Sequence, residues 1–172
     1  MLQSSSVFLR ALEPEDLELL YTIENDTTVW SVSSERSHYS KFALKQYLAS
    51  QPANIFQQGE LRLVICESLT NKSVGLIDLT NFSPIDRRAE ISICLLSTYR
   101  GRGYAKDAIV NIEKYAAEVL RLDFLYAQVC KTTNPVSMKI FESLAYAEVA
   151  VLPAWHYGKN GYEDLVILKK KL

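Results

Sequence analysis

The chain has 172 residues, a formal net charge of -1, and 48% hydrophobic and 23% charged residues. This length and composition predict one domain, residues 1–172, around a single hydrophobic core. The balanced charge provides no basic surface for nucleic acid, and no apolar run approaches the roughly 20 residues that cross a bilayer. We therefore expect neither a nucleic-acid partner nor a membrane partner.

The cysteines and histidines indicate a reduced protein without a metal site. Cys66, Cys94 and Cys130 are odd in number, far apart and set in apolar strand patterns, which is typical of core thiols rather than disulfides. His38 and His156 are too few and too distant in sequence to suggest metal ligands, so we expect no metal. The N-terminus shows no charged and apolar leader pattern, and we expect a cytoplasmic protein.

The first half of the sequence predicts short strands and two helices. Pro14 is typical of the first turn of a helix, and Ser40 is typical of the residue that caps one. In chain order we expect a strand at 7–11, helices at 14–25 and 41–49, a loop at 51–59, and strands at 61–67 and 74–81.

The second half predicts a βαβ unit followed by a helix and a hairpin. Asn134 is a helix cap with Pro135 at the first helical position, and Asn160-Gly161 is typical of a hairpin turn. The βαβ unit is expected to cross over right-handedly. In chain order we expect a strand at 87–95, helix at 105–119, strand at 124–129, helix at 135–145, and strands at 148–157 and 162–169.

A glycine-rich turn joins the strand at 87–95 to the next helix. Glycine lets the backbone approach a ligand closely, and the N–H groups and dipole at a helix start favour a pyrophosphate. The sequence has no GxxxxGK phosphate loop, and Lys106 stands where a dinucleotide fingerprint needs glycine or alanine. A tight turn without a ligand is the alternative. The residues of this candidate phosphate loop are Arg100, Gly101, Arg102, Gly103, Tyr104 and Ala105.

The candidate phosphate loop resembles the Arg/Gln-x-x-Gly-x-Gly/Ala signature of the GNAT family of N-acetyltransferases, which in that family binds the pyrophosphate of acetyl-coenzyme A. A second segment resembles the later coenzyme-binding segment of the family through Asn134, Ser137 and Phe141. Phe141 stands where the family usually has tyrosine, and Ala145 where it usually has glycine. The resemblance implies acetyl-coenzyme A as cosubstrate and no metal cofactor.

The order of predicted elements is also that of the family, so the resemblance covers nearly the whole chain. It implies a mixed α/β fold, with a largely antiparallel central sheet and a βαβ coenzyme-binding unit in a single GNAT-like domain. Residues 9–17 and 87–90 resemble the branch that holds bacterial spermidine N-acetyltransferases and the acetyltransferases of ribosomal-protein N-termini.

The function implied is direct transfer of an acetyl group from the thioester to a primary amine. The acceptor is a polyamine, a peptide N-terminus or a small amine, and the sequence does not choose among them. A non-catalytic module that binds or senses acyl-coenzyme A is the alternative function. A homodimer is common among relatives, and nothing in the sequence specifies an interface.

The strand at 87–95 has two tasks in such a reaction. The resemblance implies that the backbone of Ile93, Cys94 and Leu95 pairs with the pantetheine arm and polarises the thioester carbonyl. Glu90 is the only carboxylate in this strand pattern and alternates with apolar neighbours. We expect it to take the amine's proton or to bind the ammonium. An ordinary solvated glutamate paired with a neighbouring arginine is the alternative.

The sequence does not identify the acid that protonates the leaving thiolate. Many relatives use a tyrosine at the position of Phe141, which has no hydroxyl group. Tyr104, Tyr126 and Tyr146 are candidates by availability, and solvent is another.

Acceptor-binding residues are expected at 26–39, where Trp30 is an aromatic candidate to line a cleft. Glu35 matches in register an acid that spermidine acetyltransferases bring against the polyamine. Arg36 stands where a second acid would help. Because a polycation needs clustered carboxylates, Arg36 argues against tight polyamine binding.

Overall fold

The structure, a computed structural model, describes residues 5–30, 32, 36–50 and 54–172. Its strands are β1 (Val7–Ala11), β2 (Leu61–Glu67), β3 (Ser73–Ser83), β4 (Arg88–Leu95), β5 (Phe124–Cys130), β6 (Ala147–Gly158) and β7 (Gly161–Lys171). Its helices are α1 (Leu17–Glu24), α2 (Lys41–Ala49), α3 (Ile55–Gln58), α4 (Tyr104–Glu118) and α5 (Pro135–Ser143), with 3-10 turns at Pro14–Asp16 and Ser97–Tyr99.

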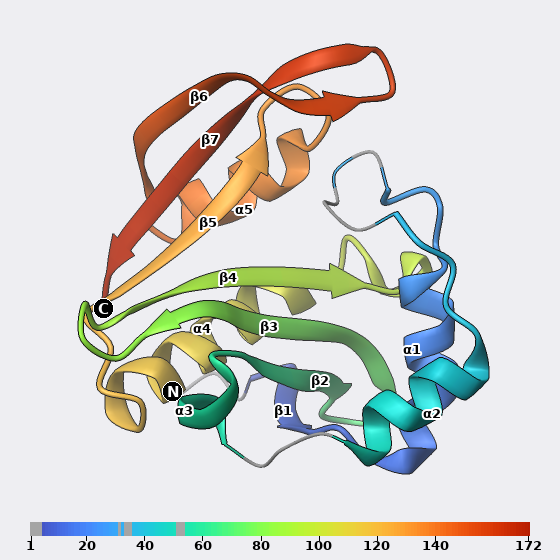
Figure 1. Ribbon diagram of the computed structural model, residues 1–172. Helices are drawn as coiled ribbons and strands as arrows, with labels where there is room; N and C mark the ends of the chain where they lie inside the picture. The colour runs from blue at the N-terminus through green and yellow to red at the C-terminus, as the bar shows by residue number, and fades with distance from the viewer. Residues whose placement is uncertain (1–4, 31, 33–35, 51–53) are drawn as a thin grey trace.

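The strands form one seven-stranded sheet in the order β1-β2-β3-β4-β5-β7-β6 (Figure 1). Neighbouring strands are antiparallel except β4 and β5, which run parallel and are joined through α4. This is the βαβ unit expected from the sequence. The prediction of a mixed α/β fold with a largely antiparallel sheet is therefore confirmed.

Helices pack on both faces of the sheet, and their apolar stripes decide where. On one face, Ile109 and Ile112 of α4 are fully buried in a core cluster that also holds Phe141 of α5. On the other face, α1 and α2 pack over β2 and β3, with Leu20 and Leu44 in a second cluster. In the described residues, no helix covers the part of this second face that β4, β5 and β7 form (Figure 1). We call this part the open face.

Capping residues start the helices where the sequence predicts them. Ser40 Oγ accepts a hydrogen bond from the Ala43 N–H (3.1 Å) at the start of α2, and Asn134 Oδ1 accepts one from the Ser137 N–H (3.3 Å) at the start of α5. The helix expected at 14–25 begins instead as a 3-10 turn and becomes α1 at Leu17. The positions of the candidate coenzyme segments thus follow from local signals.

Two local expectations are wrong in detail. The segment 51–59, expected as a loop, contains α3, which Asn54 caps and Gly59 ends with a left-handed φ of 77°; four residues are too few to show a helical period. Residues 51–53 of this segment lie outside the described part. The hairpin turn is Lys159-Asn160, because Gly158 pairs with Gly161, so the prediction was late by one residue.

Across the described ranges, none of the helices combines the length and the apolar character that crossing a membrane requires.

Candidate active site

A wedge opens between β4 and β5 at the centre of the sheet. In the part of the chain that the structure describes, the two strands pair over three positions only, the last being Glu90 opposite Tyr126. Beyond that point β4 remains paired with β3 and β5 with β7, while the two strands diverge (Figure 1). The wedge-facing edge of β4 can therefore pair with an extended ligand instead of with a strand.

The predicted pantetheine-binding residues lie along this edge of β4. Ile93 and Leu95 turn their side chains toward the α4 core, and Cys94 faces the opposite side, half-buried. The carbonyl oxygen of Leu95 accepts a hydrogen bond from Arg100 Nε at 3.0 Å, which ties the strand to the candidate phosphate loop. Burial raises the pKa of Cys94, so this residue is a neutral thiol rather than a ready nucleophile.

The candidate phosphate loop forms the sharp turn that leads into α4. Gly101 and Gly103 have left-handed φ values of 76° and 83°, and Gly103 is the N-cap of α4. A Cβ atom at either glycine would meet no atom within 4 Å, so the space beside the loop is open. The first N–H groups of a fifteen-residue helix lie at this turn and favour an anion there.

Both arginines of the loop also brace it. Arg100 Nη2 lies 3.9 Å from Asp26 Oδ2, and Arg102 donates to the carbonyl oxygen of Thr98 at 3.0 Å while its guanidinium stacks over the ring of Tyr99. Their positive charge remains at the loop in this arrangement. The structure thus brings two cations and a helix start together.

The remaining candidate coenzyme-binding residues lie on α4 and α5 and differ in how far they are buried. Tyr104 is buried and its hydroxyl donates to the Glu67 carboxylate, while Ala105 packs at the edge of the core. Asn134 and Ser137 lie at the start of α5, both half-buried. Phe141, one turn further on, is 3% exposed and packs edge-to-face on Tyr146 at 4.9 Å. Its ring therefore belongs to the core in this structure.

Glu90 lies on the open face, at the point where the wedge begins. Its Oε2 accepts hydrogen bonds from Asn81 Nδ2 (2.8 Å) and Gln128 Nε2 (3.0 Å). The neighbouring arginines have other partners, since Arg87 pairs with Asp123 and Arg88 with Asp86. Two neutral amides hold the carboxylate without neutralising it, so its charge is available to an ammonium.

Asn81 and Gln128 are partners of Glu90 that the sequence pattern does not predict. Asn81 is on β3 with a left-handed φ of 48°, and Gln128 is on β5, so they reach Glu90 from the two neighbouring strands. In the sequence, the signal for such a partner is Gln128 itself, because it is a lone amide in an apolar strand pattern. Only the sheet order shows that it faces Glu90.

The three candidate tyrosines lie in different places. Tyr104 points to Glu67 beside α4, and Tyr146 is buried against Phe141 in the α4 core. Tyr126 is paired with Glu90 and shares the open face with it. Burial raises the pKa of Tyr126, and the negative charge of Glu90 raises it further. Tyr126 is therefore the one of the three that is both protonated and beside the wedge.

The acceptor candidates lie in the connection between α1 and α2. Trp30 packs on His38, with ring centroids 4.7 Å apart. Glu35 lies outside the described residues. Arg36 donates to the carbonyl oxygen of Tyr157 at 2.5 Å, so this connection reaches across to β6.

Known proteins are similar to this chain in sequence and in fold. The sequence matches the family described as Acetyltransferase (GNAT) domain over residues 6–146. It is 26% identical to a spermidine N(1)-acetyltransferase of Vibrio cholerae over 162 residues, which is 94% of this chain and 91% of that protein. It is 31% identical to a spermidine N(1)-acetyltransferase of Escherichia coli K12 over 148 residues, 86% of this chain and 76% of that protein.

A solved structure of one of these relatives has the same fold. The crystal structure of spermidine N-acetyltransferase from Vibrio cholerae in complex with CoA and spermine superposes with a TM-score of 0.87 at 24% identity, covering 98% of this chain and 96% of that one. The seven-stranded sheet and its helices thus have the fold of that spermidine N-acetyltransferase.

The chain belongs to the GNAT acetyltransferase family. It is an N-acetyltransferase that uses acetyl-coenzyme A as cosubstrate and an amine as acceptor, as the resemblance implied.

Proposed function

We propose that this enzyme acetylates aliphatic primary amines, polyamines among them, and that Glu90 receives the acceptor's ammonium at the mouth of the wedge. The observation that carries this is the position of Glu90, which two amides hold at the last paired residue of β4 before β5 turns away. A thioester lying along β4 beyond this point would place its carbonyl carbon beside the amine.

The chemistry needs a neutral amine, a polarised carbonyl and a proton for the thiolate. Glu90 accepts the ammonium proton, directly or through one water molecule. The backbone of Ile93, Cys94 and Leu95 pairs with the pantetheine arm, and an N–H there polarises the carbonyl. Because both substrates are held in line, no covalent enzyme intermediate is required.

Tyr126 is the proposed acid. It lies opposite Glu90 across the parallel strand pair, and its raised pKa keeps it protonated at neutral pH. A protonated hydroxyl beside the wedge can give its proton to the departing thiolate. This assignment supplies the donor that Phe141, without a hydroxyl, cannot.

The pyrophosphate of the coenzyme is proposed to bind the loop at the start of α4. The backbone N–H groups that follow Gly101 and Gly103 and the charges of Arg100 and Arg102 form its anion site. Tyr104 and Ala105 begin the helix that supports this site. Asn134 and Ser137 are proposed to line the coenzyme from the α5 side, and Phe141, buried in the core, to support that side of the site from behind.

The charges on the open face determine how many ammonium groups of an acceptor can bind there. A groove of about 560 Å³ carries two cations, Arg88 and Lys169, and one anion, Asp86. Glu90 beside it brings the charges near balance, so the groove suits one ammonium at Glu90 rather than a chain of them. The groove is lined by Asp86, Arg88, Phe124, Tyr126, Ile167 and Lys169.

The polyamine part of the proposal comes from the relatives that are named spermidine N(1)-acetyltransferases. Trp30 and Glu35, from the α1–α2 connection, are the proposed contacts for the distal part of the acceptor. The near-balanced groove predicts that spermidine has a high KM here, because few carboxylates remain for its other ammonium groups.

The experiment is coenzyme A release at saturating acetyl-coenzyme A with three acceptors: spermidine, a peptide with an unblocked N-terminus, and a simple alkyl monoamine. We expect release with spermidine and with the monoamine, and an N-acetylated product by mass spectrometry. Tight coenzyme binding without release for any acceptor would reject this proposal in favour of an acyl-coenzyme A sensor.

We also propose that two copies pair as a homodimer through β6. β6 is an edge strand, and Val149, Val151, Trp155 and Tyr157 on it are each at least 40% exposed. Unpaired apolar edges commonly bind a second chain. A relative from Vibrio cholerae has a dodecameric structure. Light scattering should give twice the chain mass, and Val151→Glu should reduce it to one chain.

A further inference from the structure

Three potential metal ligands meet at the far end of the open face, although they lie far apart in the sequence. Cys130 is the last residue of β5 and pairs with Leu165 of β7. Glu163 is two residues before Leu165, and therefore on the same face of β7. His156 of β6 is directly opposite Glu163. The register of three adjacent strands thus fixes the cluster.

The ligand atoms of these residues are close to the spacing of a zinc site. The Cys130 sulfur, one imidazole nitrogen of His156 and one carboxylate oxygen of Glu163 all lie within 4.8 Å of one another. Tetrahedral zinc, with bonds of about 2.0–2.3 Å, holds its ligands about 3.5 Å apart.

The surroundings of Glu163 hold its carboxylate in place. Thr133 donates to it from both its hydroxyl (2.8 Å) and its backbone N–H (3.2 Å). Gly158 leaves the room that the carboxylate fills, because a Cβ atom there would lie 2.7 Å from Glu163 Oε1. Such outer contacts orient a ligand before a metal arrives.

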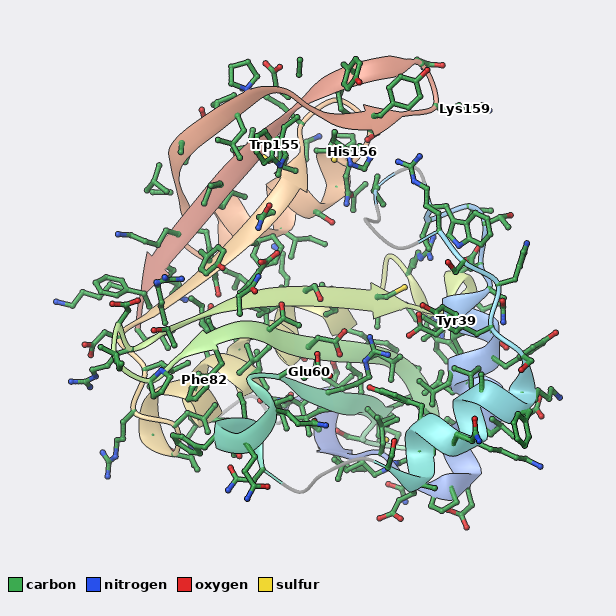
Figure 2. The ribbon with its side chains drawn as sticks, viewed as in Figure 1. Tyr39, Glu60, Phe82, Trp155, His156 and Lys159 are labelled. Atoms are coloured by element: carbon green, nitrogen blue, oxygen red, sulfur yellow. The ribbon has the colours of Figure 1, made fainter. Side chains whose placement is uncertain are left out.

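Arg36 is a positively charged group that opposes a cation here. Its Nη2 lies 3.4 Å from His156 Nε2 and donates to the carbonyl oxygen of Tyr157. Figure 2 shows His156 under the arm formed by β6 and β7, on the side that faces the α1–α2 connection. A divalent ion at the cluster repels the guanidinium, so metal binding and the Arg36 contact compete.

We propose that Cys130, His156 and Glu163 form a binding site for a zinc-type divalent ion, which leaves one coordination position open to water or another ligand. The donor set of one sulfur, one imidazole nitrogen and one carboxylate oxygen suits zinc and cobalt better than magnesium or calcium. The site is additional to the coenzyme and acceptor sites.

The site has a consequence for acetyl transfer, which rests on the proposed function. Cys130 and Gln128 face the same side of β5 two residues apart, about 7 Å, and Gln128 holds Glu90. A metal at Cys130 therefore lies on the same face as the proposed base, beyond the amide that holds it. Zinc is expected to lower turnover by obstructing the acceptor.

The test is titration of the chelator-treated protein with Co²⁺, following the thiolate-to-cobalt charge-transfer band, and with Zn²⁺ in competition against a chromogenic chelator. We expect one ion per chain. Cys130→Ser should abolish the cobalt band and weaken zinc by at least about 100-fold. Cys66→Ser, a buried cysteine of β2 in the cluster under α1 and α2, is the control and should retain both. Arg36→Ala should bind zinc more tightly than wild type.

Glu163→Gln is the second variant, in case Cys130→Ser does not fold. It should retain a shifted cobalt band and bind zinc about 10- to 100-fold more weakly. A wild-type chain without a saturable cobalt band, or a folded Cys130→Ser variant with the wild-type band, would overturn the site. Turnover measured with and without zinc is a separate readout: binding without inhibition would retain the site and reject its effect on the acceptor.

Discussion

Gln128 on β5 donates a hydrogen bond from Nε2 to Oε2 of Glu90 on β4, over 3.0 Å, at the point where these two parallel strands stop pairing. This bond joins the two walls of the wedge at its apex. It fixes the carboxylate beside the place where the reacting ends of coenzyme and acceptor are proposed to meet. The position of the base therefore depends on the strand order, and not on residues close to it in sequence.

Glu90→Gln should lower kcat by roughly 10²- to 10⁴-fold, because the amide cannot take a proton. Its similar shape should leave acetyl-coenzyme A affinity nearly unchanged, as calorimetry can check. Glu148→Gln changes an exposed glutamate of β6 in the same way and should leave turnover unaltered. Wild-type turnover in the Glu90 variant across the pH range would return this residue to a structural role.

Tyr126→Phe should lower kcat by about 10²-fold if the hydroxyl is the acid. The raised pKa of Tyr126 predicts that loss of the phenol proton lowers wild-type kcat at alkaline pH, and the variant should lose this alkaline decrease. Tyr162→Phe, an exposed tyrosine of β7, is the matched control. An unchanged pH profile would mean that solvent protonates the thiolate.

Gly103→Ala should weaken coenzyme A binding by at least about tenfold, because the added Cβ enters the space proposed for the phosphate oxygens. Gly59→Ala is a close control. Both glycines have φ near 80°, and neither Cβ would meet an atom of the chain. Both variants should lose similar stability in thermal melts, but only Gly103→Ala should lose affinity in calorimetry. Equal affinities would reject the loop as the pyrophosphate site.

Phe141→Tyr should lower the free energy of unfolding by about 1–3 kcal/mol without increasing turnover, because it buries a hydroxyl in an apolar core. The ring is 3% exposed and packs on Tyr146. Denaturant melts and kcat on the same preparation test this. An increase in kcat with unchanged stability would mean that position 141 faces the coenzyme sulfur after all.

Asp16→Asn should destabilise the protein at neutral pH by about 1–3 kcal/mol. Asp16 is 4% exposed and binds both terminal nitrogens of Arg10, each at 2.7 Å. Burial acts to raise the pKa of Asp16, but the hydrogen bonds from Arg10 and the backbone of Glu13, together with the charge of Arg10, lower it overall.

The sign of the pH effect follows from that lowered pKa. The stabilisation is complete above the unfolded-state pKa of about 3.9 and is lost as the pH falls through the lower folded-state value. The difference in stability between wild type and Asp16→Asn, from urea melts, should therefore shrink below about pH 4. A difference that is constant down to pH 2 would show that the ion pair does not contribute.

The sequence by itself determined the elements whose signals are local. The glycines of residues 100–105, the Ser40 and Asn134 caps and the strand patterns placed the helices, most strands and the candidate phosphate loop, because each depends on residues within one or two turns of it. The family resemblance rested on these local segments. A helix as short as α3 was missed because it has no period to detect.

Only the tertiary structure decided which distant side chains share a site. The amides of Asn81 and Gln128 reach Glu90, and Cys130 meets His156 and Glu163, through pairing of strands that are far apart in the chain. The tertiary structure also placed Tyr126, and not Tyr104 or Tyr146, beside the wedge, whereas the sequence could not choose among these three candidate acids. Strand order and register result from the burial of whole apolar faces against α1, α2, α4 and α5, and no local pattern contains that information.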